Sequence, residues 1–288
     1  MWNLESFAAG GRQLCCVRST KPAGPIVGMI HGVLRSWNYL LPIASRLREA
    51  YEICALDQRG HGTSDRAERY LTIDYVEDAL AWIRESLGRP VILYGHSLGA
   101  MVAAGAAAAC PQLVRGVILE DPPFHTLGDR IRETTFHSYF SAIRPFVGSN
   151  APVSESAQRL AELRYSAPGT GMEYRLGDVR DAVSLRFLAA TLRRVDPVVV
   201  DPIVEGRWLD GYDCDDVFRS IRCPVLLLQA DSASGGMLYD VDVQRFKELA
   251  GDVTHLRMPG VGHAMHWQRT EEIVNLSFAF CESLDGHA

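Results

Sequence analysis

The pentapeptide Gly95-His96-Ser97-Leu98-Gly99 is the part of the chain best suited to covalent chemistry. It follows the apolar run of residues 91–94 and opens an alanine-rich stretch, so a strand, a sharp turn and a helix are expected around it. The two glycines suit a turn so tight that side chains would strike neighbouring backbone, and the strain lifts the Ser97 hydroxyl clear of the sheet. We therefore predict that Ser97 attacks a carbonyl carbon.

A serine nucleophile needs a base beside it, because its hydroxyl is weakly reactive at neutral pH. The best candidate is His263, in a glycine-rich loop (residues 259–263) directly after the last predicted strand. Loops at the carboxyl ends of strands are where α/β sheets place their ligands. His266 nearby would allow a metal pair with His263, but no carboxylate or cysteine joins them at ligand spacing. We expect no metal and no cofactor.

The oxyanion formed by serine attack needs backbone N–H donors already aimed at it. Leu98, the residue after the nucleophile, supplies one, and Val33, after the early apolar run, is the candidate for the second. We expect Trp37, His31 and His96 to line the substrate pocket. The alternatives are that both histidines are structural and that Trp37 only caps the helix that follows.

Short apolar runs alternate along the chain with longer stretches whose apolar residues recur at three- and four-residue spacing. Such alternation is typical of a parallel sheet flanked by helices. We predict strands at residues 26–32, 51–57, 91–95, 114–120, 223–230 and 253–258. Helices are predicted at residues 37–50, 72–88, 97–110, 240–250 and 268–284.

The alternation stops between Pro122 and Asp216, where helix-like patterns and prolines occur without a convincing strand. We predict that residues 1–122 and 217–288 form the core domain and that residues 123–216 form a helical cap. The aromatic residues of this segment either line a pocket from above or give the cap a core of its own; they are Phe136, Tyr139, Phe140, Phe146, Trp208 and Tyr212.

Four motifs, IHGVLRSW, ALDQRGHGTSD, YGHSLGA and GVGHAMH, occur in this order. With them the chain resembles the α/β-hydrolase superfamily throughout, apart from the insertion. The resemblance implies an eight-stranded, mostly parallel sheet flanked by helices, with a helical cap inserted after the sixth strand. It also implies the chain order serine, acid, histidine. Serine at the elbow disfavours haloalkane dehalogenase and epoxide hydrolase chemistry, which use a carboxylate nucleophile in this fold.

The acid is where the sequence departs from the family pattern, because alanine stands at residue 233, the usual place of the aspartate. Asp231 lies in the correct loop but two residues early. Asp121 ends the sixth strand, a position from which a minority of the family takes its acid. Either carboxylate would hold the His263 tautomer and stabilise the imidazolium. We favour Asp121, with Asp231 as the alternative; Glu120 should point to the opposite side of the strand.

Composition narrows the function further. The formal net charge of −6, without a cluster of Lys and Arg, excludes a nucleic-acid partner. No apolar stretch is long enough to span a bilayer, and the N-terminus lacks a basic start followed by an apolar run. Seven scattered cysteines without a CxxC pair suit buried thiols in a reducing compartment. We expect a cytoplasmic protein that acts on a small molecule.

Together these features predict a serine hydrolase of the carboxylesterase or lactonase kind, cleaving an ester, lactone or amide bond through an acyl-enzyme on Ser97. The acidic composition and the aromatic cap favour a small, neutral, partly apolar substrate. The same residues would support carbon–carbon bond hydrolysis or perhydrolysis, because one fold hosts many reactions. A noncatalytic ligand receptor of the same fold is the alternative from another class, and it would predict a damaged triad.

Overall fold

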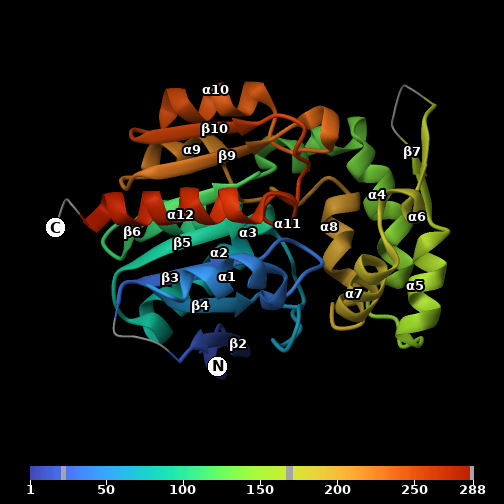
Figure 1. Cartoon of the computed structure of the whole chain (residues 1–288), viewed down its shortest axis with the longest axis horizontal. Coiled ribbons are helices and arrows are strands. Elements are labelled where there is room, and N and C mark those ends of the chain that lie inside the picture. The colour runs from blue at the N-terminus through green and yellow to red at the C-terminus, as the bar shows by residue number, and fades with distance from the viewer. Residues whose placement is uncertain (21–23, 167–170, 286–288) are drawn as a thin grey trace.

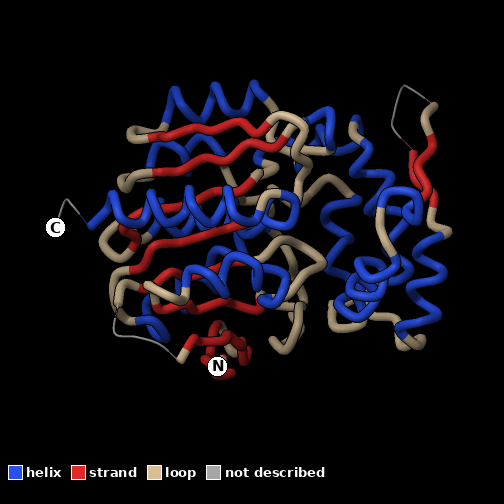
Figure 2. Tube along the Cα trace, viewed as in Figure 1, coloured by secondary structure: helices blue, strands red, loops and turns tan. Residues whose placement is uncertain are grey.

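An eight-stranded sheet forms the centre of the computed structural model, which describes residues 1–20, 24–166 and 171–285. The strand order is β1-β2-β4-β3-β5-β6-β9-β10 (Figures 1 and 2). The β1–β2 and β2–β4 pairs are antiparallel and the other neighbours are parallel. The strands are β1 (Trp2–Ala9), β2 (Arg12–Ser19), β3 (Ile26–Ile30), β4 (Glu52–Asp57), β5 (Val91–His96), β6 (Val114–Glu120), β9 (Val225–Ala230) and β10 (Val253–Met258).

The predicted apolar runs all form strands of this sheet, and alternate residues of a strand pack on opposite faces. In β5, Val91 and Leu93 join one hydrophobic cluster, whereas Ile92 and Tyr94 join the other. A strand covered by helices on both faces needs apolar residues at every position, which is why these runs are continuous.

Helices cover both faces of the sheet (Figure 1). On one face lie α1 (Leu41–Leu47), α11 (Met265–Gln268) and α12 (Thr270–Asp285). On the other lie α2 (Thr72–Ala81), α3 (Leu98–Ala109), α9 (Cys214–Ser220) and α10 (Asp240–Leu249). The five predicted helices thus correspond to α1, α2, α3, α10 and α12, with a 3₁₀ turn (Trp37–Leu40) before α1 and a π-helical segment (Trp82–Leu87) after α2.

The insertion gathers its own elements at one end of the sheet, on the right in Figure 1. They are α4 (Thr135–Ile143), α5 (Val153–Ala161), α6 (Leu176–Val179), α7 (Ala182–Leu192), α8 (Asp201–Val204) and the short strands β7 (Arg164–Ser166) and β8 (Glu173–Arg175). The expectation of no strand in this segment was wrong: β7 and β8 form an antiparallel ribbon that is too short and too exposed to show an apolar run. The last residues of the segment enter α9, which packs with the sheet-covering helices.

None of the described helices combines the length and apolar character needed to cross a membrane. The cysteines are free thiols: Cys15 and Cys223 are partly exposed, and the other five are buried.

Candidate active site

Ser97 sits at a strained turn between β5 and α3. Its φ of 56° and ψ of −121° lie in a region that L residues rarely occupy. A Cβ on Gly95 would lie 2.2 Å from the Gly99 carbonyl oxygen, and one on Gly99 would lie 2.0 Å from the Ile30 carbonyl oxygen. The predicted reason for both glycines, close approach of backbone, is therefore confirmed.

The imidazole of His263 lies against the carboxylate of Asp121, with Nδ1 and Oδ2 2.6 Å apart. The Asp121 oxygens also accept the backbone N–H groups of Ala230, Met237 and Leu238 at 2.8 to 3.2 Å. These donors satisfy a carboxylate that is fully buried. Because Nδ1 must carry the proton for this contact, Nε2 of His263 is left free to accept one.

Asp231, the alternative acid, makes other contacts. Its carboxylate accepts the backbone N–H groups of Gly260 at 2.8 Å and Ala233 at 3.0 Å, and these hydrogen bonds lower its pKa. It therefore ties the loop after β9 to the loop after β10. Of the two candidate acids, only Asp121 contacts His263 in the described part of the chain.

Two backbone N–H groups near Ser97 are unoccupied. Leu98 is the first residue of α3, so its N–H has no acceptor within the helix. The N–H of Val33 has no hydrogen-bond acceptor among the described residues. The neighbouring Leu34, at φ 61°, instead donates its N–H to Nε2 of His61 at 3.1 Å. This bond fixes the loop and leaves Val33 as the available donor.

His31 and Trp37 do not line the cavity that contains Ser97, so their expected place in the pocket wall was wrong. His31 is fully buried: Nδ1 donates to the Gly32 carbonyl at 2.7 Å, and Nε2 accepts the Gln58 N–H at 3.2 Å. Burial lowers its pKa to about 4, so the ring is a neutral structural group. Trp37 packs on Trp2, with ring centroids 5.6 Å apart.

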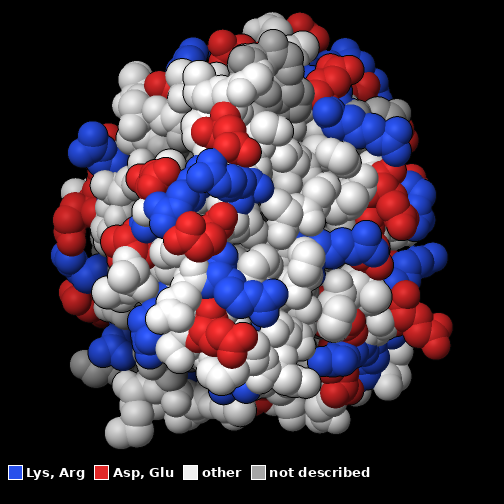
Figure 3. All heavy atoms as spheres, turned by 90° about the vertical axis from the view of Figure 1, so that its right-hand side faces the viewer, with Lys and Arg blue, Asp and Glu red and all other residues white. Residues whose placement is uncertain are grey.

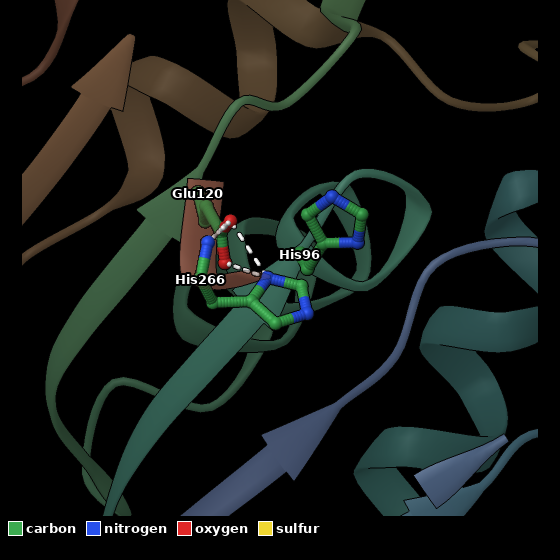
Figure 4. Close-up of side chains that lie close together, drawn as sticks. All are labelled: His96, Glu120 and His266. Atoms are coloured by element: carbon green, nitrogen blue, oxygen red, sulfur yellow. Dashed lines mark hydrogen bonds and ion pairs between the residues drawn. The ribbon is translucent and has the colours of Figure 1, made fainter. Parts of the chain in front are cut away.

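His96 does line the cavity, and it belongs to a buried cluster with Glu120 and His266 (Figure 4). Its Nε2 donates to the His263 carbonyl at 3.0 Å, and burial lowers its pKa well below the ordinary value. Glu120 accepts the His266 ring Nδ1 at 2.8 Å, the His266 backbone N–H at 2.9 Å and the Tyr94 hydroxyl. As expected, Glu120 and Asp121 have different partners.

The charges of this cluster compensate one another. Burial works against the charge of Glu120, but the adjacent His266 and the hydrogen bonds from His266 and Tyr94 lower its pKa to about 2. Nε2 of His266 faces the Tyr39 carbonyl at 3.2 Å, so both ring nitrogens face acceptors, which suits the doubly protonated ring. A metal ion here would break these bonds. We interpret the cluster as a buried ion pair that anchors the start of α11, directly after His263.

A cavity of ≈ 570 Å³ lies between the carboxyl ends of the parallel strands and the insertion. Its wall includes Gly32, Val33, Ser97 and His263 at these strand ends, where such sheets bind ligands. The insertion contributes residues from α4, β7, β8 and α6. Cavities of this volume are typical of small-molecule binding sites.

Of the six aromatic residues named in the insertion, three have the first predicted role, that of lining a pocket. Phe136, Tyr139 and Phe140 line the cavity. Trp208 and Tyr212 lie outside it, and their side chains donate to backbone carbonyls of the core. Further residues that line the cavity were not predicted from the sequence, namely Arg35, Tyr39, Tyr165, Tyr174 and Arg180. Arg35 was within reach of prediction, since it lies two residues after Val33 in a family motif.

Comparison with known proteins shows the family to which the chain belongs. Residues 29–276 match the model of the alpha/beta hydrolase family, and the protein belongs to that family. A relative from Mesorhizobium japonicum, 2-(acetamidomethylene)succinate hydrolase, is 40% identical over 254 residues, covering 84% of this chain and 83% of that protein. N-formylmaleamate deformylase of Pseudomonas putida is 25% identical over 258 residues, or 87% of this chain and 84% of that protein.

Solved structures show the same fold. A crystal structure of E-2-(acetamidomethylene)succinate hydrolase superimposes with a TM-score of 0.73, covering 98% of this chain and 100% of that chain at 22% identity. Its likeness supports the eight-stranded core described above.

Proposed function

We propose that the protein is a serine hydrolase that cleaves a carbonyl–heteroatom bond of a small molecule through an acyl-enzyme on Ser97. The observation that carries the proposal is the convergence of three groups: the strained Ser97 on the cavity wall, the His263–Asp121 pair, and the unoccupied N–H groups of Val33 and Leu98. Nucleophile, base, orienting acid and oxyanion donors are what acyl transfer requires.

In the first half of the reaction, Ser97 Oγ attacks the carbonyl carbon while Nε2 of His263 takes the hydroxyl proton. The resulting oxyanion accepts the N–H groups of Val33 and Leu98. As the tetrahedral intermediate collapses, the bond to the leaving amine or alcohol breaks, and His263 protonates that group. Asp121 stabilises the imidazolium that forms in between and keeps its own charge.

In the second half, a water molecule attacks the acyl carbon and His263 takes its proton. Collapse of the second intermediate breaks the bond to Ser97, whose oxygen regains the proton, and the free acid leaves. The buried ion pair of Glu120 and His266 holds the following helix start in place, which fixes the loop that carries His263.

Among the bonds such a site cleaves, we favour the amide. The relatives reported above are named for an acetamido compound and an N-formyl compound, which are both amides. We further propose that residues 123–216 act as a cap that selects the substrate, since α4 and α6 contribute to the cavity wall. The alternative of a noncatalytic receptor rested on the alanine at residue 233, and the contact between Asp121 and His263 weighs against it.

Labelling with a fluorophosphonate, followed by mass spectrometry of the modified peptide, tests the proposal. We expect modification at Ser97 that is absent in Ser97→Ala and strongly slowed in His263→Ala. A folded protein that is not labelled, and that hydrolyses neither short esters nor short amides, would refute it.

A further inference from the structure

The wall of the Ser97 cavity is positively charged, although the chain as a whole carries a formal charge of −6. Arg35 and Arg180 line the cavity, and no aspartate or glutamate is among the described residues that do. The Asp121 carboxylate lies behind the wall, where His263 and three backbone N–H groups occupy it. The average composition therefore gives the wrong sign for the charge of the pocket.

Arg35 lies two residues after Val33 and reaches the cavity without a carboxylate partner. Its Nη1 donates to the Leu34 carbonyl at 3.0 Å, and its guanidinium carbon lies 4.8 Å from the centre of the Tyr39 ring. Burial works against its charge, but Tyr39 and Tyr139 raise its pKa, so the group stays a cation. Within residues 1–20, 24–166 and 171–285, no acidic side chain forms an ion pair with it.

The one arginine among the buried residues that the structure describes does have such partners. The guanidinium of Arg59 pairs with Asp78 and lies 3.8 Å from Asp74. A half-buried cation is expensive to keep away from water unless an anion completes its hydrogen bonds. A negatively charged ligand in the cavity would supply that anion to Arg35.

Arg180 approaches the same cavity from the cap, directly after α6. Tyr165 lines the same cavity, and the charge of Arg180 acts against the rise that burial causes in the pKa of this phenol. Arg175, at the other end of α6, is a natural comparison: it pairs with Glu162 at 2.5 Å and Asp178 at 2.8 Å and does not line the cavity. Arg180 has no ion pair in the described part of the chain.

The outer surface of the cap carries charges of both signs. On the face at the cap end of the molecule, basic side chains lie beside acidic ones (Figure 3). Ion pairs of the cap include Arg164–Glu173 and Arg207–Glu205. The cavity wall differs from this surface because no acidic side chain among the described residues lines it.

We propose that the substrate is an anion with a carboxylate that Arg35 binds beside the scissile carbonyl, while Arg180 adds a second positive charge from the cap. This inference rests on the proposed function, because it takes Ser97 as the place where the carbonyl reacts. Guanidinium binds carboxylate through paired, charge-assisted hydrogen bonds. Tyr139, which also lines the cavity and interacts with Arg35, brings a hydroxyl donor to this wall.

A positive charge at Arg35, close in sequence to the oxyanion donor Val33, would also lower the barrier to the reaction. A substrate carboxylate near the developing oxyanion would repel it, and this repulsion would raise the barrier to serine attack. The cation of Arg35, which lines the same cavity two residues after Val33, would offset this repulsion. A neutral substrate of the same shape gains nothing from either arginine.

Two esters of equal chain length test the inference: monomethyl succinate carries a carboxylate where methyl butyrate carries a methyl group. We expect kcat/KM to favour monomethyl succinate by about 10- to 100-fold. Arg35→Gln should bring this ratio close to one, Arg180→Gln should lower it less, and Arg35→Lys should give an intermediate value. Arg175→Gln is the matched control and should keep the ratio.

Binding to Ser97→Ala, measured by calorimetry, gives a readout that does not depend on turnover. Monomethyl succinate should bind more tightly than methyl butyrate, and the added Arg35→Gln substitution should remove the difference. If Ser97 is not labelled and neither ester is cleaved, the proposed function fails, but selective binding of monomethyl succinate would still support the charged pocket. Equal binding of the two esters, or selectivity that survives both Arg35→Gln and Arg180→Gln, would overturn it. Should Arg35→Gln fail to fold, Arg35→Lys and Arg180→Gln carry the same comparison.

Discussion

Replacing Asp121 by asparagine should almost abolish activity. Oδ2 of the carboxylate accepts His263 Nδ1–H and the Met237 N–H, and Oδ1 accepts the N–H groups of Ala230 and Leu238. Asparagine presents one oxygen and one NH₂ group. One of the two accepting positions is therefore replaced by a donor that faces other N–H donors. If the NH₂ group faces His263, Nδ1 becomes the acceptor and Nε2 carries the proton, and the ring can then no longer accept the proton of Ser97.

The expected loss of activity follows from the change of tautomer. An enzyme whose catalytic histidine is held in the wrong tautomer by an aspartate-to-asparagine exchange loses about 10⁴-fold in kcat. The other orientation turns the NH₂ group toward backbone donors and leaves them unsatisfied, at a cost of about 1–3 kcal/mol of folding stability. Hydrolysis of a short acyl ester measures the first effect, and urea unfolding measures the second.

Asp231→Asn is the matched control, since this exposed carboxylate holds only the N–H groups of Gly260 and Ala233. We expect its activity to stay within about threefold of wild type, with a stability change within about 1 kcal/mol. Loss of activity in Asp231→Asn, with Asp121→Asn retaining more than a tenth of the wild-type rate, would refute the reasoning.

Three further predictions concern the frame around the site. Gly99→Ala puts a Cβ 2.0 Å from a backbone carbonyl of β3, so the free energy of unfolding should fall by about 3 kcal/mol or more in urea titrations; a change below about 1 kcal/mol would contradict this. Glu120→Gln leaves His266 without its anion and should cost about 3–5 kcal/mol, seen as a lower Tm, and an unchanged Tm would show that the pair is not charged. Burial lowers the pKa of His31 from 6.5 to about 4 and that of His61 to about 3, so below about pH 6.5 the unfolded chain binds protons that the folded chain does not. Stability should therefore fall from pH 6.5 to 4, and urea midpoints that stay constant over this range would disprove it.

The parallel strands could be predicted because burial on both faces makes their sequences continuously apolar. All six residues of β5 are buried, for example. The N-terminal hairpin escaped prediction because most residues of β1 are partly or fully exposed, which leaves no apolar run. A signal was present in the turn: Gly10 and Gly11 have φ of 52° and 77°, and adjacent glycines favour the two-residue hairpin turn.

At the site, the groups fixed by local sequence were predictable and those fixed by packing were not. The turn around Ser97 demands glycines that the sequence displays directly. The choice between Asp121 and Asp231 depends on which carboxylate meets His263 and the backbone donors of other loops, and chain spacing does not encode that. The motif that contains Val33 makes Arg35 a candidate wall residue, but only the folded protein shows that Arg35 lines the cavity without a carboxylate partner.

Backbone strain links these parts of the site. Leu34, Ser97 and Asp121 all have positive φ, and they follow the neighbouring strands β3, β5 and β6. The Leu34 N–H is held by His61, the Ser97 N–H by the carbonyl of residue 120 at 2.9 Å, and the Asp121 N–H by the carbonyl of residue 228 at 2.8 Å. Since the loop after β4 holds Leu34, and strands β6 and β9 hold Ser97 and Asp121, the oxyanion loop, nucleophile and acid are tied to one frame. The core is therefore organised before substrate binds, and differences in substrate preference must come from residues outside that frame, of which Arg35 and Arg180 carry the charge.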